Sequence, residues 1–201
     1  GGGMYFYRND KVIIHNNSFL YCSAYQSGCA IAIDAFNTAF IITKSIVTFC
    51  TIDQPGVSQI LINNAGGAIY LGEYNSRISI ATSHFTNITS YTYGAIACMK
   101  YNEFIQIEGN KFERISLRYK KGNTVGSAIL IYVNNHHLKI FQNEFVNLSA
   151  MFTAGLQFFQ YNSEAMVQYN TFTNCKALVN SGAIAVGNYN HAIKFIFNVF
   201  K

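Results

Sequence analysis

The sequence predicts an all-β protein of one domain, a right-handed parallel β-helix (solenoid) of about seven coils, each 27–28 residues long. Two observations predict this fold: an asparagine that recurs at nearly constant spacing, and rows of apolar residues at fixed distances from it. A fixed period of this length is typical of a solenoid, in which each repeat stacks on its neighbours. Right-handed winding is the expectation for connections between parallel strands.

The recurring asparagine, here called the reference asparagine, occurs seven times. Successive spacings are 28, 38, 27, 33, 27 and 28 residues, so a period of 27 or 28 carries two insertions. The reference asparagines are Asn9, Asn37, Asn75, Asn102, Asn135, Asn162 and Asn190. Ten residues after them stand Phe19, Val47, Phe85, Phe112, Phe145, Phe172 and Phe200.

Apolar rows accompany the asparagine in every coil. They lie six and four residues before it and three, five, ten and thirteen residues after it. These rows hold 41 positions, of which Gly3 is the one that is not apolar, although the composition is only 50% hydrophobic. Apolar residues that alternate with polar ones mark strands with one buried face. The rows therefore predict three strands in each coil, with in-register stacking between coils.

The coils are expected at residues 1–27, 28–65, 66–93, 94–126, 127–154, 155–181 and 182–201. The insertions are expected at 51–65 and 119–125, and no linker or domain boundary is seen. Proline is unwelcome in a hydrogen-bonded ladder, so the position of Pro55 in the first insertion fits strands elsewhere. Both insertions follow the phenylalanine strand and should project from the same corner, where loops commonly carry function.

Polar rows are the first candidates for chemistry. The reference asparagine is present in all seven coils, and a second row of Asn or Ser follows eight residues later. A stacked amide can donate to one neighbour and accept from the other, so a ladder of amides satisfies itself. We expect the ladders to hold the bends, with a ligand role as the alternative.

An aromatic strip lies one residue before the reference asparagine, interrupted by Arg8 and Asn134. One interpretation is ring stacking that stiffens a corner, and the other is a platform on which sugar rings bind. The strip consists of Phe36, Tyr74, Tyr101, Tyr161 and Tyr189.

Three Asn-x-Ser/Thr motifs make Asn16, Asn87 and Asn147 candidate glycosylation sites if the protein is secreted. Asn87 and Asn147 share one row, two residues past the phenylalanine, where a side chain should point outward.

Five cysteines are present, and four of them fall on inward rows, where cysteine behaves as a small apolar residue. Cys22 and Cys50 occupy the same row of adjacent coils, so their Cα atoms should lie about 5 Å apart. That distance suits a disulfide, although parallel side chains make the torsion difficult. No Cys-x-x-Cys pair occurs, and we predict neither a metal site nor a cofactor.

Charge and acid placement exclude several functions. Charged residues make up 11% of the chain and the net charge is +5, without the continuous basic stripe of a nucleic-acid surface. No apolar run is long enough to span a membrane. The outward row of the first strand holds no acid, His, Lys or Arg, and no paired carboxylates are visible. We therefore predict no catalytic residue.

The stretches Gly66–Ile69, Gly94–Ile96, Ser127–Ile129 and Gly182–Ile184 resemble the GGAI repeats of chlamydial polymorphic outer-membrane proteins and of some protist surface proteins. That family pairs GGAI with FxxN, whereas here Asn follows Phe85, Phe145 and Phe172 by two residues. The resemblance implies a right-handed β-helix with surface or adhesive roles. A broader similarity is to pectate-lyase-like β-helices, whose catalytic residues have no counterpart on the first strand here.

The leading hypothesis is a non-catalytic structural or adhesive rod, located outside the cell or on its surface. Because no polar cap protects either end, we expect further coils or other protein chains to dock there, as in a filament. The first alternative is a pectate-lyase-like enzyme or binding protein for polysaccharides. An intracellular scaffold is the second.

Overall fold

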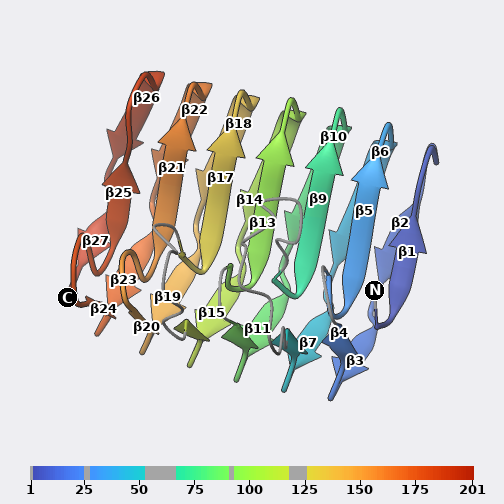
Figure 1. The fold of residues 1–201 in the computed structure, drawn as a ribbon, viewed down its shortest axis with the longest axis horizontal. Coiled ribbons are helices and arrows are strands. Elements are labelled where there is room, and N and C mark those ends of the chain that lie inside the picture. Colours follow the sequence, from blue (N-terminus) through green and yellow to red (C-terminus); the bar gives the residue numbers. More distant parts are fainter. Residues whose placement is uncertain (1, 25–27, 53–66, 91–92, 118–125) are drawn as a thin grey trace, which may run out of the picture.

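The computed structural model describes residues 2–24, 28–52, 67–90, 93–117 and 126–201, which form a stack of seven coils (Figure 1). All strand pairs are parallel, and each strand pairs with the equivalent strands of the preceding and following coils. The first and last coils lie at opposite ends of the stack. The parallel β-helix of about seven coils that the repeat predicts is therefore confirmed.

Three long sheets correspond to the three predicted strands of each coil. The first sheet contains β1 (Met4–Phe6), β5 (Ile31–Ala35), β9 (Ile69–Glu73), β13 (Ile96–Lys100), β17 (Ile129–Val133), β21 (Leu156–Gln160) and β25 (Ile184–Val186). The second sheet contains β2 (Ile13–His15), β6 (Thr38–Thr43), β10 (Ser76–Ala81), β14 (Glu103–Glu108), β18 (His136–Phe141), β22 (Ser163–Gln168) and β26 (His191–Ile196). The third sheet contains β3 (Ser18–Leu20), β7 (Ile46–Thr48), β11 (His84–Thr86), β15 (Lys111–Glu113), β19 (Glu144–Val146), β23 (Thr171–Thr173) and β27 (Val199–Phe200).

A fourth sheet of two-residue strands was not predicted. It follows the inward row that lies thirteen residues after the reference asparagine, and two residues are too few to show an alternating pattern. Its strands are β4 (Ser23–Ala24), β8 (Thr51–Ile52), β12 (Thr89–Ser90), β16 (Ser116–Leu117), β20 (Ser149–Ala150) and β24 (Lys176–Ala177). Thr51 and Ile52 thus belong to a strand rather than to the insertion expected at 51–65. The rest of that insertion, and the one expected at 119–125, lie outside the described residues.

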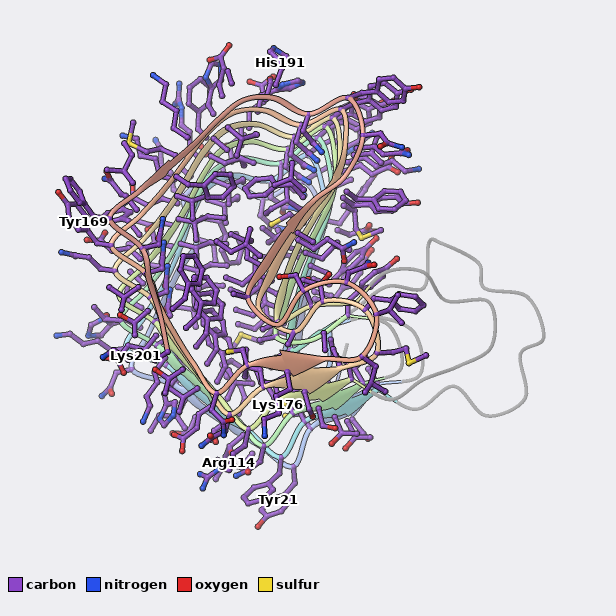
Figure 2. All side chains as sticks on the ribbon, turned by 90° about the vertical axis from the view of Figure 1, so that its left-hand side faces the viewer. Tyr21, Arg114, Tyr169, Lys176, His191 and Lys201 are labelled. Atoms are coloured by element: carbon purple, nitrogen blue, oxygen red, sulfur yellow. The ribbon has the colours of Figure 1, made fainter. Side chains whose placement is uncertain are left out.

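The core is a continuous apolar column enclosed by the sheets. Viewed along the stack, side chains fill the interior, while labelled residues such as Tyr21, Arg114 and Tyr169 lie on the outside (Figure 2). The phenylalanine row stacks face to face, with ring centroids 5.0 Å apart for Phe85–Phe112 and 4.9 Å apart for Phe112–Phe145. Burial of this column is the main source of stability, because the hydrophobic effect scales with apolar area removed from water.

The register of the first strand differs from the prediction. The inward rows assigned Gly3 and Tyr5 to the interior, but Met4 pairs with Ile31 and Phe6 pairs with Ile33. Met4 and Phe6 pack against the core, and Tyr5 is exposed. A shift of one residue exchanges the two faces of a strand, which explains why Gly3 alone broke the apolar pattern.

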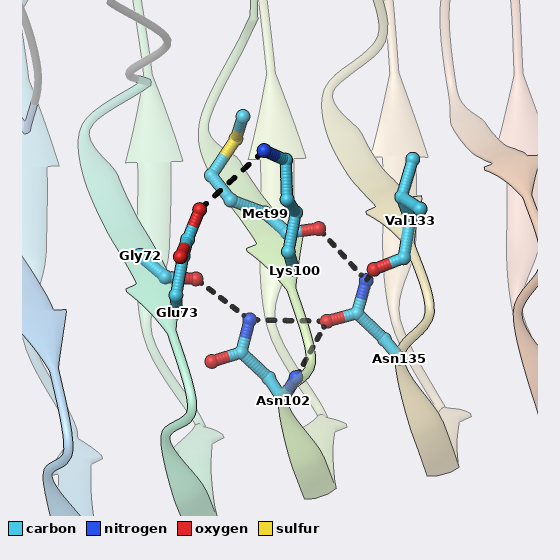
Figure 3. A network of polar contacts seen from close by, with 7 residues as sticks. All are labelled: Gly72, Glu73, Met99, Lys100, Asn102, Val133 and Asn135. Atoms are coloured by element: carbon cyan, nitrogen blue, oxygen red, sulfur yellow. Dashed lines mark hydrogen bonds and ion pairs between the residues drawn. The ribbon is translucent and has the colours of Figure 1, made fainter. Parts of the chain in front are cut away.

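The asparagine ladder closes the bend between the first and second sheets, and it is confirmed. Asn102 donates from its main-chain N to Asn135 Oδ1 over 3.1 Å, and from Nδ2 to the same oxygen over 3.0 Å (Figure 3). The same Nδ2 donates to the Gly72 carbonyl over 2.9 Å. Asn75 repeats the arrangement one coil earlier, donating to Asn102 Oδ1. Since these amide groups are already engaged by protein atoms, the middle of the ladder has a structural role rather than a ligand-binding one.

The bends carry left-handed residues that are mostly not glycine. Every described residue with positive φ except Gly28 lies one residue before the reference asparagine, or two, seven or twelve residues after it. Gly109 is the one glycine in these four columns, and aromatic, basic and β-branched residues fill most of the others. A left-handed conformation strains a residue that has a Cβ atom, so each coil tolerates several such strained positions.

Replacing Thr82 by glycine is therefore expected to stabilise the protein by about 1 kcal/mol, because a β-branched residue at φ 47 loses its strain. Thr82 is exposed, and Gly109 occupies the same column one coil later. Urea unfolding measures the change. The reciprocal Gly109→Thr change should lower stability by a similar amount, whereas Thr171→Gly, within β23, should also lower it. A destabilised Thr82→Gly protein would contradict the strain argument.

Candidate functional site

The aromatic strip occupies the bend between the first and second sheets. Each of its residues precedes a reference asparagine and has φ between 55 and 58 degrees. This conformation turns the ring out of the stack while the next residue, the asparagine, turns inward; it is buried in every case except Asn190, which is half-buried in the last coil. The asparagine ladder therefore places the rings of adjacent coils one inter-strand distance apart.

The rings form two runs of parallel stacks. Centroids lie 5.3 Å apart for Phe36–Tyr74, 5.0 Å apart for Tyr74–Tyr101 and 4.9 Å apart for Tyr161–Tyr189. Between 41% and 70% of each residue's surface is exposed. Stacked aromatic rings attract one another, and the exposed part of each ring is accessible to a ligand.

Both interruptions of the strip are polar. The Arg8 guanidinium lies 5.5 Å from the centroid of the Phe36 ring and 5.1 Å from that of Tyr7, in cation–π contact. Asn134 has the same left-handed conformation as the rings and separates Tyr101 from Tyr161. Along the stack, this position is therefore occupied by an arginine, then three aromatic residues, then an asparagine, then two more aromatic residues.

A shallow groove runs along the outer face of the second sheet and was not expected from the sequence. It has a volume of about 460 Å³, and Phe104, Gln106, His137, Lys139 and Glu164 are among its lining residues. A second groove, lined in part by Ala39, Ile41 and Arg77, shares Phe104 and Gln106 with it. No pattern in the sequence indicates this groove, because left-handed residues break the alternation from which the outward rows were assigned.

His137 and Glu164 form the shortest ion pair among the described residues. His137 Nδ1 lies 2.7 Å from Glu164 Oε2, and the His137 ring stacks on Phe104 with centroids 4.7 Å apart. The side chains of His137 and Glu164 are 43% and 56% exposed, so water competes for both. Because both side chains are accessible to water, His137 and Glu164 form a surface ion pair and not a shielded acid–base couple.

A second apolar cluster lies on the outer face of the first sheet, apart from the enclosed core. Tyr93, Met99, Leu130 and Tyr132 are buried there, and Tyr70 packs against them. Burial, with a smaller contribution from the Asp34 carboxylate, raises the pKa of Tyr70 to about 12. Burial also raises the pKa of Tyr93 and of Tyr132. The outward row of the first strand predicts a face without charge, and this buried outer cluster is an addition that the row did not predict.

The candidate glycosylation sites all lie at corners. Asn16 and Asn147 are exposed and Asn87 is half-buried, and all three are left-handed. The Asn147 carboxamide is engaged, because Asn174 Nδ2 donates to its Oδ1 over 2.7 Å. Their modification stays a prediction.

The five cysteines are free thiols in this structure. The disulfide that the spacing of Cys22 and Cys50 makes possible stays a prediction. The described residues contain no group of three or more His, Cys, Asp or Glu arranged to hold a metal ion. Nor do they contain a helix long and apolar enough to cross a membrane.

Comparisons with protein-family models, with curated proteins and with solved structures give no match. The chain is a parallel β-solenoid by its geometry.

Proposed function

We propose that the protein is a non-catalytic structural or adhesive rod, outside the cell or on its surface, whose ends dock further coils or other protein chains. The observation that carries the proposal is the apolar face of the last coil. Phe195 and Phe200, which belong to inward rows, are 44% and 60% exposed there. With Ile184 and Val186 they line an open groove of about 420 Å³.

Strand pairing supports the same proposal. Three of the sheets have β25, β26 and β27 as edge strands on one side. The edge strands of the same sheets on the opposite side are β1, β2 and β3. The outer edges of such strands present main-chain N–H and C=O groups in the pattern that a further parallel strand requires. A head-to-tail contact of this kind does not close, and it therefore extends a rod or filament.

The location outside the cell or on its surface is supported by the GGAI resemblance to chlamydial and protist surface proteins and by the three Asn-x-Ser/Thr motifs. A rod of this type needs no active site, which agrees with the scattered acids of the sequence.

Sedimentation of the 201-residue chain tests the proposal. We expect concentration-dependent association of the wild-type chain. The double variant Phe195→Lys/Phe200→Lys should be monomeric, because two charges on the docking face oppose burial. Ile46→Lys is a matched control, since Ile46 is 46% exposed on the lateral surface, and it should associate like the wild type. A wild-type chain that stays monomeric at high concentration would contradict the proposal.

Binding of a polysaccharide along the aromatic strip is the second candidate, and the stacked, exposed rings favour it. A monomeric wild-type chain that soluble polysaccharides retard in native gels, with the retardation lost in Tyr101→Ser, would favour this function instead.

A further inference from the structure

Two pairs of tyrosines in the aromatic strip hold their phenol rings in parallel contact. The ring centroids of Tyr74 and Tyr101 are 5.0 Å apart, with 9° between the ring planes. Those of Tyr161 and Tyr189 are 4.9 Å apart, with 7° between the planes. Among the described residues these are the two stacks of tyrosine on tyrosine, because the other stacked tyrosine rings face phenylalanine. Two phenols in contact can undergo a coupling reaction that an isolated phenol cannot.

The main chain keeps both pairs in register. The Tyr74 main-chain N donates to the Lys100 carbonyl over 3.2 Å, and the Tyr161 main-chain N donates to the Asn188 carbonyl over 3.4 Å. The residue after each of the four tyrosines belongs to the asparagine ladder, which joins the same coils through amide hydrogen bonds. The two phenols of each pair therefore stay one inter-strand distance apart while the coils are folded.

All four rings are exposed at the surface of the bend. Within the described part of the chain, none of their hydroxyls has a hydrogen-bond partner, whereas the Tyr5 hydroxyl donates to Asp34 Oδ2 over 2.6 Å. Water therefore solvates these hydroxyls and can accept the proton that a phenol releases when it is oxidised. An oxidant in solution can reach the rings without any opening of the fold.

We propose that Tyr74 with Tyr101, and Tyr161 with Tyr189, are two dityrosine-forming sites, modified by a haem peroxidase that consumes hydrogen peroxide. The oxidised peroxidase takes one electron from each phenol and the hydroxyl proton passes to water, which leaves a phenoxyl radical on each ring. The two radicals form one carbon–carbon bond between the ring carbons next to the oxygens. Each of these carbons then loses its hydrogen as a proton, while its oxygen regains one. For each cross-link, two electrons and two protons reduce one hydrogen peroxide to two water molecules.

The neighbours of the two pairs limit each pair to one cross-link. Phe36 stacks on Tyr74 with centroids 5.3 Å apart, but a ring without a hydroxyl forms no phenoxyl radical. Asn134 separates Tyr101 from Tyr161, whose main chains lie two inter-strand distances apart, about 10 Å. The third coil would thus become joined to the fourth, and the sixth to the seventh. The reaction is independent of the proposed function, because it needs only the folded strip and the oxidant.

Peptide mapping of the peroxidase-treated chain tests the two sites. A mixture of unlabelled and isotope-labelled chains is oxidised at micromolar concentration and digested with trypsin and a Glu-specific protease. Cleavage after Glu73, Lys100 and Glu164, among other residues, places each tyrosine of the strip in a separate peptide. We expect both predicted linked peptides, with the two halves carrying the same label. Because a held pair has an effective concentration of millimolar or more, links within a chain should exceed links between chains by at least about a hundredfold.

Tyr169 is the control within the same chain. Its ring is 52% exposed, within the range of the strip tyrosines, and it lies on the outside of the stack (Figure 2). It stacks on Phe197 with centroids 5.4 Å apart, so it has no phenol partner and should form no link within the chain. Oxidation is continued until the unmodified Tyr169 peptide begins to disappear. Phe197→Tyr supplies the missing hydroxyl and should add a third link, at Tyr169.

Two further variants each remove one site. Phenylalanine already occupies this column at Phe36, so Tyr101→Phe and Tyr189→Phe keep a ring in the stack. Tyr101→Phe should lose its own link and keep the Tyr161–Tyr189 link at the wild-type yield, and Tyr189→Phe should do the reverse. The wild-type map decides even where a variant does not fold. The proposal is overturned if either predicted link is missing from the oxidised wild type, or if links of Tyr169 within the chain are equally abundant.

Discussion

Replacing Asn102 by alanine is expected to destabilise the protein by about 3–5 kcal/mol. The change removes the Oδ1 atom that accepts from both the main-chain N and the Nδ2 of Asn75, at 3.0 Å each. It also removes the donor to the Gly72 carbonyl. Asn75 and Asn102 are fully buried, and each buried polar group left without a partner costs about 1–3 kcal/mol. Equilibrium unfolding in guanidinium chloride measures the loss.

Glu103→Ala is the matched control for this variant, because Glu103 is the next residue in sequence and is exposed. It should change stability by less than about 0.5 kcal/mol. An Asn102→Ala protein as stable as the control would mean that water replaces the amide, and the ladder would then not hold the bend.

Replacing Phe112 by alanine is expected to cost about 3–5 kcal/mol, because it opens a cavity in the middle of the core. The Phe112 ring is fully buried and stacks on Phe85 and Phe145, so neither neighbour can close the gap without leaving its own stack. Thermal and chemical unfolding should both report the loss.

Phe200→Ala changes the same residue type in the same row, but Phe200 is 60% exposed, so in the monomer it should cost under about 1 kcal/mol. Lys139→Ala, on the exposed face of β18, should cost under about 0.5 kcal/mol. Equal losses for Phe112→Ala and Lys139→Ala would mean that the inward and outward faces are exchanged.

The ladder and the core column could be predicted because they depend on a property that a sequence displays directly, a fixed distance between residues of one kind. Asn75, Phe85 and Ile78 needed only their spacing to be placed, since in-register stacking brings equal positions of each coil together. The aromatic strip followed from the same spacing, and its rings do stack where they were expected.

The corners could not be predicted in the same way. Left-handed residues such as Arg77 and His137 interrupt the alternation of inward and outward side chains, and their identity gives no sign of their backbone conformation. The one-residue shift in register that places Met4 on the inward face depends on the number of residues in the first bend.

The direction of the hydrogen bonds has a mechanical consequence. Every ladder joins one coil to the next, so the bonds between strands lie along the length of the stack, with the two chain ends at opposite extremes (Figure 1). When the two ends are pulled apart, the interfaces between coils should break one at a time, because each coil is bonded only to its two neighbours. A released coil of 27 residues, the spacing of Asn75 and Asn102, extends to about 90 Å, whereas it adds only about 4.8 Å to the folded stack. The protein would therefore lengthen in large steps under load and absorb work at each step.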